Sequence, residues 1–177
     1  ETSAAVKDVD SNIKVMIHTT SRNSGNNTKG VLDLLNSSIY DVIGLSYYPF
    51  YNHGNLETLS ETIKGIKTAL PEEDVVIAET SYCYTSKDGD GAGNSIKGTT
   101  DLVKGYPASI EGQADVIRDV CAAANEAGAL GVFYWEGTWI PVGKATANNA
   151  PIWEKYGSGW ASSYASDYDP EDAGLYY

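Results

Sequence analysis

Apolar and polar positions along the chain predict strands and helices in turn. Four short apolar runs rich in β-branched residues fit strands buried on both faces. We expect these strands at 13–18, 41–48, 75–78 and 130–135. Between them, apolar residues recur at helical spacing over 31–35, 56–70 and 111–127. This order predicts an α/β fold with parallel strands and right-handed crossover helices.

Two other segments read as loops. Residues 84–109 are polar and far longer than an ordinary strand-to-helix connection, which indicates a functional loop. Gly128 fits the C-terminal cap of the helix before it. Beyond residue 137, Trp and Tyr lie in a Gly, Ser and Asn background, which favours a ligand-facing loop over a core.

Composition narrows the class of protein. The 177 residues carry 12 Lys and Arg against 24 Asp and Glu, a formal net charge of −12, which argues against binding to nucleic acid. No apolar run reaches the roughly 18 residues of a membrane span, so we expect no membrane partner. The chain has thirteen Tyr and four Trp but only two Phe, which favours a hydrated ligand that stacks on aromatic rings, such as carbohydrate.

The cysteines and the first residues say little about the compartment. Cys83 and Cys121 form no disulfide framework; a bridge between them is conceivable, but two free thiols are favoured. The chain opens on Glu-Thr-Ser-Ala-Ala without a signal segment, so we expect a processed or truncated chain.

Candidate chemistry gathers where the predicted strands end. These positions hold His18, Tyr47, Tyr48, Glu79 and the pair Trp135–Glu136. Active sites of parallel α/β folds form at the carboxyl edge of the sheet, and a carboxylate flanked there by aromatics suits a glycosidase. The alternative is that Glu79 is an N-cap or loop carboxylate in a salt bridge.

Several motifs resemble one family. They are DVIGLSYYPF (41–50), VIAETSY (76–82), EGQA (111–114) and FYWEGTWIPV (133–142), followed by YGSGWASSY (156–164). Together they resemble the endo-β-1,4-galactanases of glycoside hydrolase family 53, of bacterial type. The four long motifs stand in the family's order and cover nearly the whole chain.

The resemblance implies a (β/α)₈ TIM barrel that hydrolyses β-1,4-galactan with retention. Glu79 matches the nucleophile at the end of strand seven, so the four strands would be strands five to eight. Residues 1–177 would then be the C-terminal part of a single catalytic domain. The N-terminal half, the last helix and the acid/base would be absent, and the isolated fragment inactive.

Several other polar residues could act together with Glu79. Glu136 is an acid/base candidate, although a role in orienting Glu79 suits it equally well. The pair Asn125–Glu126 resembles the Asn-Glu pair that supplies the family's acid/base, but it lies inside a predicted helix, remote from the strand ends. Tyr48 could donate a hydrogen bond that keeps Glu79 ionised, with Tyr47 as its competitor. His18 could bind sugar, donate to the site or be structural.

Aromatic residues supply the expected sugar platform. By resemblance, Trp135 forms the floor of the sugar site, and Trp139 and Trp153 stack on galactosyl units. Gly137 and Thr138 depart from the common Trp-Glu-Pro-Ala-Trp pattern, which puts the aim of Trp139 in doubt. A structural role is favoured for Trp160.

A calcium site is expected in the loop after Glu79. Oxygen ligands alternate in a Gly-rich turn, with side chains of Asp88, Asp90 and Asn94 and the carbonyl of Ala92. Bacterial members of the family resemble this in carrying a structural calcium ion in this loop. The alternative is a solvated Asp/Gly turn.

The expected partner is the galactan of arabinogalactan side chains in pectin, and a substrate of that size implies a secreted protein. Free sheet edges predict either a complementing N-terminal half or a homodimer. Two alternatives stay open. One is a calcium-dependent, non-catalytic galactan-binding module, and the other is a different retaining β-glycosidase of the same clan.

Overall fold

The structure is a computed structural model that describes residues 2–20, 40–50, 55–87, 96 and 102–135. The chain divides into two compact units. The first consists of Glu1–Ser81 and Ala114–Trp135, and the second of Tyr82–Gln113 and Glu136–Tyr177. The first unit holds the sheet and the residues around Glu79.

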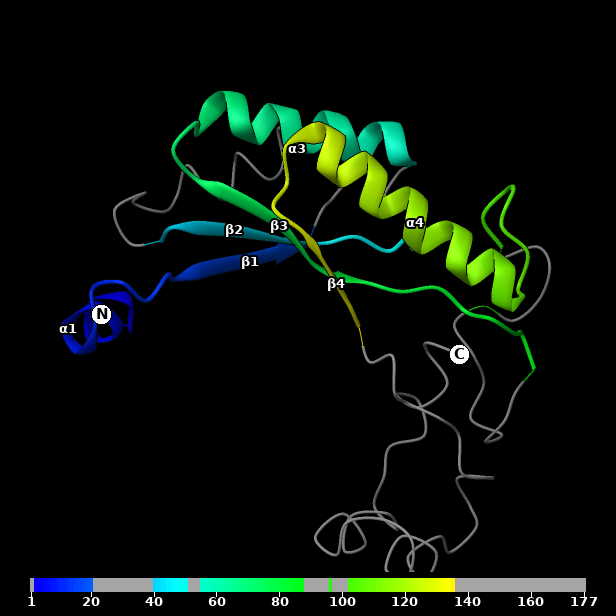
Figure 1. The fold of residues 1–177 in the computed structure, drawn as a ribbon, viewed down its shortest axis with the longest axis horizontal. Coiled ribbons are helices and arrows are strands. Elements are labelled where there is room, and N and C mark those ends of the chain that lie inside the picture. The colour runs from blue at the N-terminus through cyan, green and yellow to red at the C-terminus, as the bar shows by residue number, and fades with distance from the viewer. Residues whose placement is uncertain (1, 21–39, 51–54, 88–95, 97–101, 136–177) are drawn as a thin grey trace, which may run out of the picture. The chain divides into compact units, whose positions relative to one another are not determined.

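In the part of the chain that the structure describes, four parallel strands form one sheet in the order β1-β2-β3-β4 (Figure 1). Their bounds are β1 Met16–Thr20, β2 Val42–Ser46, β3 Asp74–Thr80 and β4 Val132–Tyr134. Every neighbouring pair is parallel. The predicted α/β fold with a parallel sheet is therefore confirmed for the described strands. The helix predicted at 31–35 lies outside the described residues.

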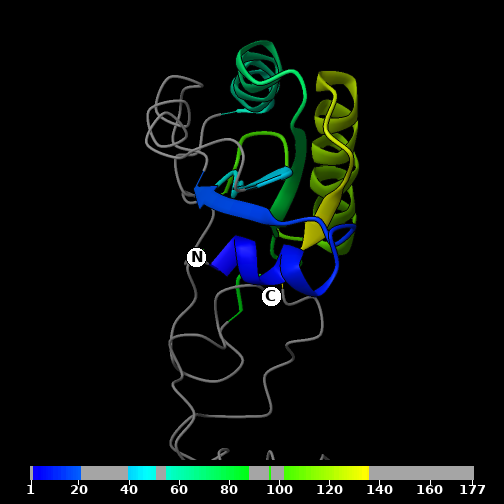
Figure 2. The same cartoon turned by 90° about the vertical axis from the view of Figure 1, so that its left-hand side faces the viewer.

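Among the described residues, two helices cover one face of this sheet. They are α3, Leu56–Ala69, and α4, Ile110–Ala127, which lie side by side over the strands (Figures 1 and 2). The Ser60 hydroxyl of α3 donates to the Ala123 carbonyl of α4 over 3.4 Å. Both helices occur where the apolar periodicity predicts them.

Capping residues mark the start of α3 and the end of α4. The Asn55 side chain accepts a hydrogen bond from the Thr58 amide over 2.9 Å, which caps the start of α3. At the end of α4, Gly128 has φ +96° and donates to the Asn125 carbonyl, while Ala129 donates to Ala124. This pair of bonds is a Schellman motif, which confirms Gly128 as the predicted cap.

The core lies between the sheet and the helices. The side chains of Ile43, Leu45, Val75 and Ile77 alternate along β2 and β3 and are fully buried. Helix residues at one-turn spacing are also buried, namely Leu59, Ile63, Ile66, Val116, Val120 and Ala124. Burying an aliphatic side chain of this size contributes about 1.5–3 kcal/mol, so this layer is the main source of stability.

A third helix, α1 at Thr2–Val9, was not predicted from the sequence. It has no buried residue and lies near the amino end of β1 (Figure 1). Lys7 of α1 forms an ion pair of 2.8 Å with Asp41, which also accepts from the Val15 amide over 2.7 Å. The Lys7 hydrogen bond, with that from Val15, lowers the pKa of Asp41.

Strand boundaries differ from the predicted ones in ways that matter for the site. β1 runs to Thr20 rather than ending at His18, so His18 lies in the middle of the strand. β3 extends through Glu79 to Thr80, whereas the apolar run suggested an end at Ala78. Both strands continue because their polar residues still pair with β2 through the backbone, which hydropathy does not register.

In the second unit, the described residues are organised around Tyr82. Its buried hydroxyl donates to the Tyr106 carbonyl over 2.8 Å and accepts from the Val103 amide over 3.1 Å. Gln113 donates to the Tyr82 carbonyl over 2.6 Å. Burial raises the pKa of Tyr82. The predicted loop 84–109 is therefore held to Tyr82 near its C-terminal end, through Val103 and Tyr106.

Candidate active site

The site forms where β2 and β3 reach their carboxyl ends. Tyr48, two residues beyond the end of β2, donates its hydroxyl to Glu79 Oε2 over 2.9 Å. The predicted hydrogen bond between these two residues is present. Tyr47, the competing candidate, is 1% exposed and donates its main-chain amide to the Glu79 carbonyl over 2.8 Å. Neighbouring strand residues face opposite ways, and it is Tyr48 that shares the face of Glu79.

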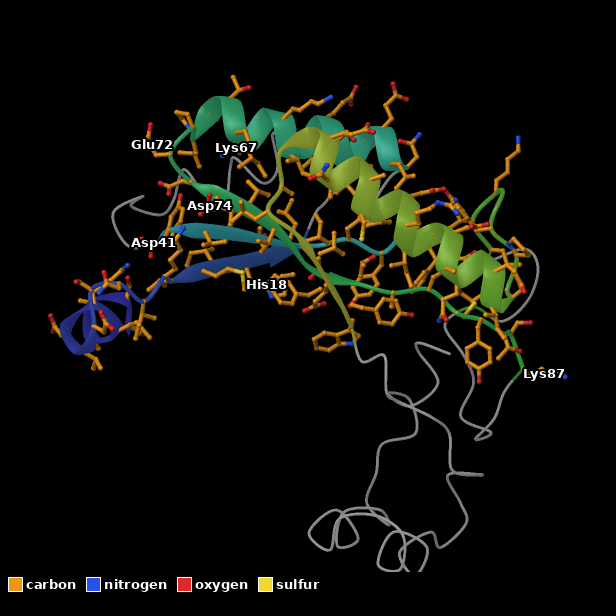
Figure 3. All side chains as sticks on the ribbon, viewed as in Figure 1. His18, Asp41, Lys67, Glu72, Asp74 and Lys87 are labelled. Atoms are coloured by element: carbon orange, nitrogen blue, oxygen red, sulfur yellow. The ribbon has the colours of Figure 1, made fainter. Side chains whose placement is uncertain are left out.

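His18 approaches the other oxygen of the carboxylate. Its Nε2 lies 3.5 Å from Glu79 Oε1 and 2.8 Å from Ser46 Oγ. His18 lies on the face of the sheet opposite α3 and α4 (Figure 3). Three neighbouring strands thus contribute side chains to one cluster of Glu79, Tyr48, His18 and Ser46, which we call the Glu79 cluster.

A β-bulge in β3 aims Glu79 into this cluster. Leu45 pairs with Ile77 but Ser46 pairs with Glu79, so β3 has one more residue than β2 over this stretch. The register against β4 shows the same extra residue, because Ile77 pairs with Val132 and Thr80 with Tyr134. Bulges of this kind often re-aim a side chain beside an active site. Here the bulge brings Glu79 to the face of Ser46 and His18.

Exposure in the cluster suits a reactive carboxylate. The side chain of Glu79 is 21% exposed and that of His18 is 36% exposed, whereas Ser46 is 5% exposed as a residue. A ligand can therefore reach the Glu79 carboxylate while the Tyr48 hydroxyl holds one of its oxygens. A fixed, partly exposed carboxylate can attack an electrophilic carbon or stabilise a positive charge.

Trp135 directly follows β4, and its main-chain amide donates to the Thr80 carbonyl over 2.8 Å. This bond anchors the main chain of Trp135 to Thr80, the residue that follows Glu79 in β3. Asn125 and Glu126 are exposed on α4, in the helix where the sequence placed them. Neither contributes to the Glu79 cluster.

Several predicted site residues lie outside the described residues. These are Glu136, Trp139, Trp153 and the calcium ligands Asp88, Asp90, Ala92 and Asn94. Calcium binding therefore stays a prediction from the sequence, as does secretion. Within the described part of the chain, no group of three His, Cys, Asp or Glu is placed to hold a metal, and no helix is long and apolar enough to span a membrane. Cys83 and Cys121 are both free thiols.

Sequence reasoning missed Ser46. Its signal was weak, because a serine in an otherwise apolar strand is common and has several explanations. Its position two residues before Tyr48 places both on one face of the extended chain, which could have drawn attention to it.

Comparisons with known proteins show relatives of this chain. A family model described as Glycosyl hydrolase family 53 matches residues 1–172. The endo-beta-1,4-galactanase of Bacillus subtilis (strain 168) is 46% identical over 183 residues, which span 100% of this chain and 42% of that protein. The arabinogalactan endo-beta-1,4-galactanase of Cellvibrio japonicus is 34% identical over 134 residues, which span 76% of this chain and 32% of that protein.

A solved structure supports the same relationship. The GH53 catalytic domain of Ignisphaera aggregans superposes with a TM-score of 0.70 at 39% identity, covering 77% of this chain and 39% of that one. The chain thus spans about two fifths of the length of the B. subtilis relative and of this structure.

Proposed function

Because the chain belongs to glycosyl hydrolase family 53, we propose that it is part of an enzyme that hydrolyses β-1,4-galactan, with Glu79 as the nucleophile. Its four parallel strands and their helices are consistent with part of a (β/α)₈ barrel, the fold of the family's solved structures. The observation that carries the proposal is the Glu79 carboxylate itself. It lies at the carboxyl edge of the sheet, partly exposed, with Tyr48 on one oxygen and His18 near the other.

The proposed reaction proceeds with retention in two displacements. A Glu79 oxygen attacks the anomeric carbon while the bond to the leaving oxygen breaks, and a second carboxylic acid gives that oxygen a proton. The product is a galactosyl ester of Glu79. Water then gives a proton to the second carboxylate and attacks the same carbon, which releases Glu79 and the sugar.

The second carboxyl group must lie about 5–5.5 Å from the first. Among the described carboxylates, only Glu79 lies at the carboxyl ends of the strands. Asp41 and Asp74 lie at the amino ends of β2 and β3 (Figure 3). We therefore place the acid/base outside the described residues.

Sugar binding is proposed at Trp135. An indole face packs well against the apolar C–H face of a galactose ring. The anchored main chain of Trp135 would keep such a platform in place beside Glu79. The galactan partner follows from the names of the relatives and from this combination of aromatic and carboxylate groups.

The test is Glu79→Gln in the protein at the full length of its relatives, with Glu126→Gln on the exposed face of α4 as the matched control. Loss of a nucleophile should lower kcat on galactan about a thousandfold or more, with galactan binding retained. Glu126→Gln should keep wild-type kinetics. Turnover by Glu79→Gln within tenfold of wild type would remove Glu79 from the chemistry, whereas galactan binding without any turnover by the folded wild-type protein would favour the galactan-binding module.

A further inference from the structure

The Glu79 cluster contains a buried hydroxyl that the proposed chemistry does not use. Ser46 Oγ lies 2.8 Å from His18 Nε2, a normal hydrogen-bond distance. The same nitrogen lies 3.5 Å from Glu79 Oε1, which is beyond the ordinary range for an N–H···O bond. His18 Nε2 therefore faces two oxygens but bonds closely to only one.

Electrostatics decide which atom holds the proton. An ionised carboxylate has no hydrogen to donate, so an unprotonated Nε2 would direct its lone pair toward the negative Glu79. A protonated Nε2 is attracted to both oxygens. The geometry therefore favours a hydrogen on Nε2 that is donated to Ser46 Oγ, with the serine as acceptor.

We propose that Ser46 is a positioning residue that holds the Nε2 hydrogen of His18 away from a direct bond with Glu79. The inference rests on the proposed role of Glu79 as nucleophile. By accepting this hydrogen, Ser46 keeps the His18 ring close to Glu79. The partial positive charge of the His18 N–H group then orients Oε1. Oε1 keeps its lone pair available for the anomeric carbon, while Tyr48 holds Oε2.

The backbone makes Ser46 suited to this task. His18 pairs with Gly44 in the sheet, so Ser46 is the next residue of β2 on the same face. Ser46 is also the direct register partner of Glu79 beyond the bulge. Its side chain has a single heavy-atom rotation and is 5% exposed, so little freedom is lost in holding the ring.

Kinetics of a double-mutant cycle test the positioning role in the full-length protein. In Ser46→Ala, the Nε2 hydrogen should turn to Glu79 Oε1, and kcat on galactan should fall about tenfold with KM within twofold. Ser46→Thr should restore most of kcat. In a His18→Gln background, Ser46→Ala should have less than a twofold further effect, because the serine acts through the histidine.

A matched control separates this role from a general loss of stability. Ser60→Ala removes another partly buried serine hydroxyl, on α3 and away from the cluster, and should leave kcat unchanged. Equal effects of Ser46→Ala in the wild-type and His18→Gln backgrounds would overturn the proposal. So would wild-type kcat in Ser46→Ala.

Ring NMR tests the proton position without any activity. At pH 8, where an ordinary imidazole is neutral, the His18 signal should show the Nε2–H tautomer and should move in Ser46→Ala but not in Ser60→Ala. His18→Gln identifies the signal by its disappearance. An Nδ1–H tautomer would overturn the proposed donor direction. Full activity of Glu79→Gln with the expected tautomer would instead overturn the proposed nucleophile, and with it the catalytic purpose of Ser46, but not the hydrogen bond from His18 to Ser46.

Discussion

At the scale of single residues, the proposed chemistry depends on how the two oxygens of Glu79 are held. Oε2 accepts from Tyr48, and Oε1 lies near His18, whose Nε2 is bonded to Ser46. The sequence could indicate Glu79 and leave two tyrosines open, because strand alternation gives the face only once the register is known. It could not indicate the bond to Ser46, since that contact joins two strands whose relative register no local pattern encodes.

Removing the Tyr48 hydroxyl tests the contact on Oε2. Tyr48→Phe deletes the 2.9 Å hydrogen bond to the carboxylate, and bonds to charged groups contribute about 1.5–3 kcal/mol. We expect kcat on galactan to fall by about 10- to 100-fold in the full-length protein, with KM changed little. Tyr84→Phe, at a tyrosine that is 42% exposed, should keep the wild-type rate. An unchanged kcat in Tyr48→Phe would show that this bond has no part in turnover.

At the scale of elements, the strands place the site and the loops and helix ends support it. Continuous apolar runs predicted β2 and β3, because these strands are buried, and apolar residues at helical spacing predicted α3 and α4, because each helix buries one face. The bulge in β3 and helix α1 escaped prediction, since a bulge is a matter of pairing with neighbours and α1 buries no residue. These two features are held by backbone pairing and by charge, neither of which appears in a hydropathy pattern.

The ion pair of Asp41 gives α1 a pH-dependent attachment. The pKa of Asp41 is lowered from its ordinary 3.8, chiefly by Lys7. Because the folded-state pKa is lowered, the ionised Asp41 carboxylate stabilises the fold above about pH 3.8. This stabilisation is lost as the pH falls through the folded-state pKa. Asp41→Asn should therefore lower Tm at pH 7, and the difference from wild type should shrink below pH 3.8.

Thermal unfolding across this pH range measures the effect. Asp8→Asn, at an exposed position of α1, should leave Tm within error at both pH values. A constant Tm difference between Asp41→Asn and wild type from pH 7 to pH 3 would contradict the ionic explanation.

In the second unit, the Tyr82 hydroxyl should stabilise the segment between β3 and α4. Tyr82→Phe leaves the Val103 amide and the Tyr106 carbonyl, both partly buried, without this partner. We expect the free energy of unfolding to fall by about 1–3 kcal/mol, measured by urea denaturation. Tyr84→Phe again serves as the control. A change below about 0.5 kcal/mol would show that the segment is held by other contacts.

At the scale of the whole molecule, the chain spans 42% of its B. subtilis relative. The described residues supply one carboxylate at the site, whereas retaining hydrolysis needs two. The 177-residue chain alone should therefore hydrolyse galactan at least about a thousandfold more slowly than the protein at the full length of its relatives. Comparable rates would place the acid/base within this chain, with Glu136 the first residue to substitute.

The most direct test of the central claim is chemical trapping of the nucleophile. A 2-deoxy-2-fluoro-galactoside with a good leaving group forms a slowly hydrolysed ester with the attacking carboxylate of a retaining enzyme. After treatment of the full-length protein, peptide mass spectrometry should find the added fluorogalactosyl group on Glu79, and Glu79→Gln should take up none. An inactivated enzyme labelled at any other carboxylate would contradict the account.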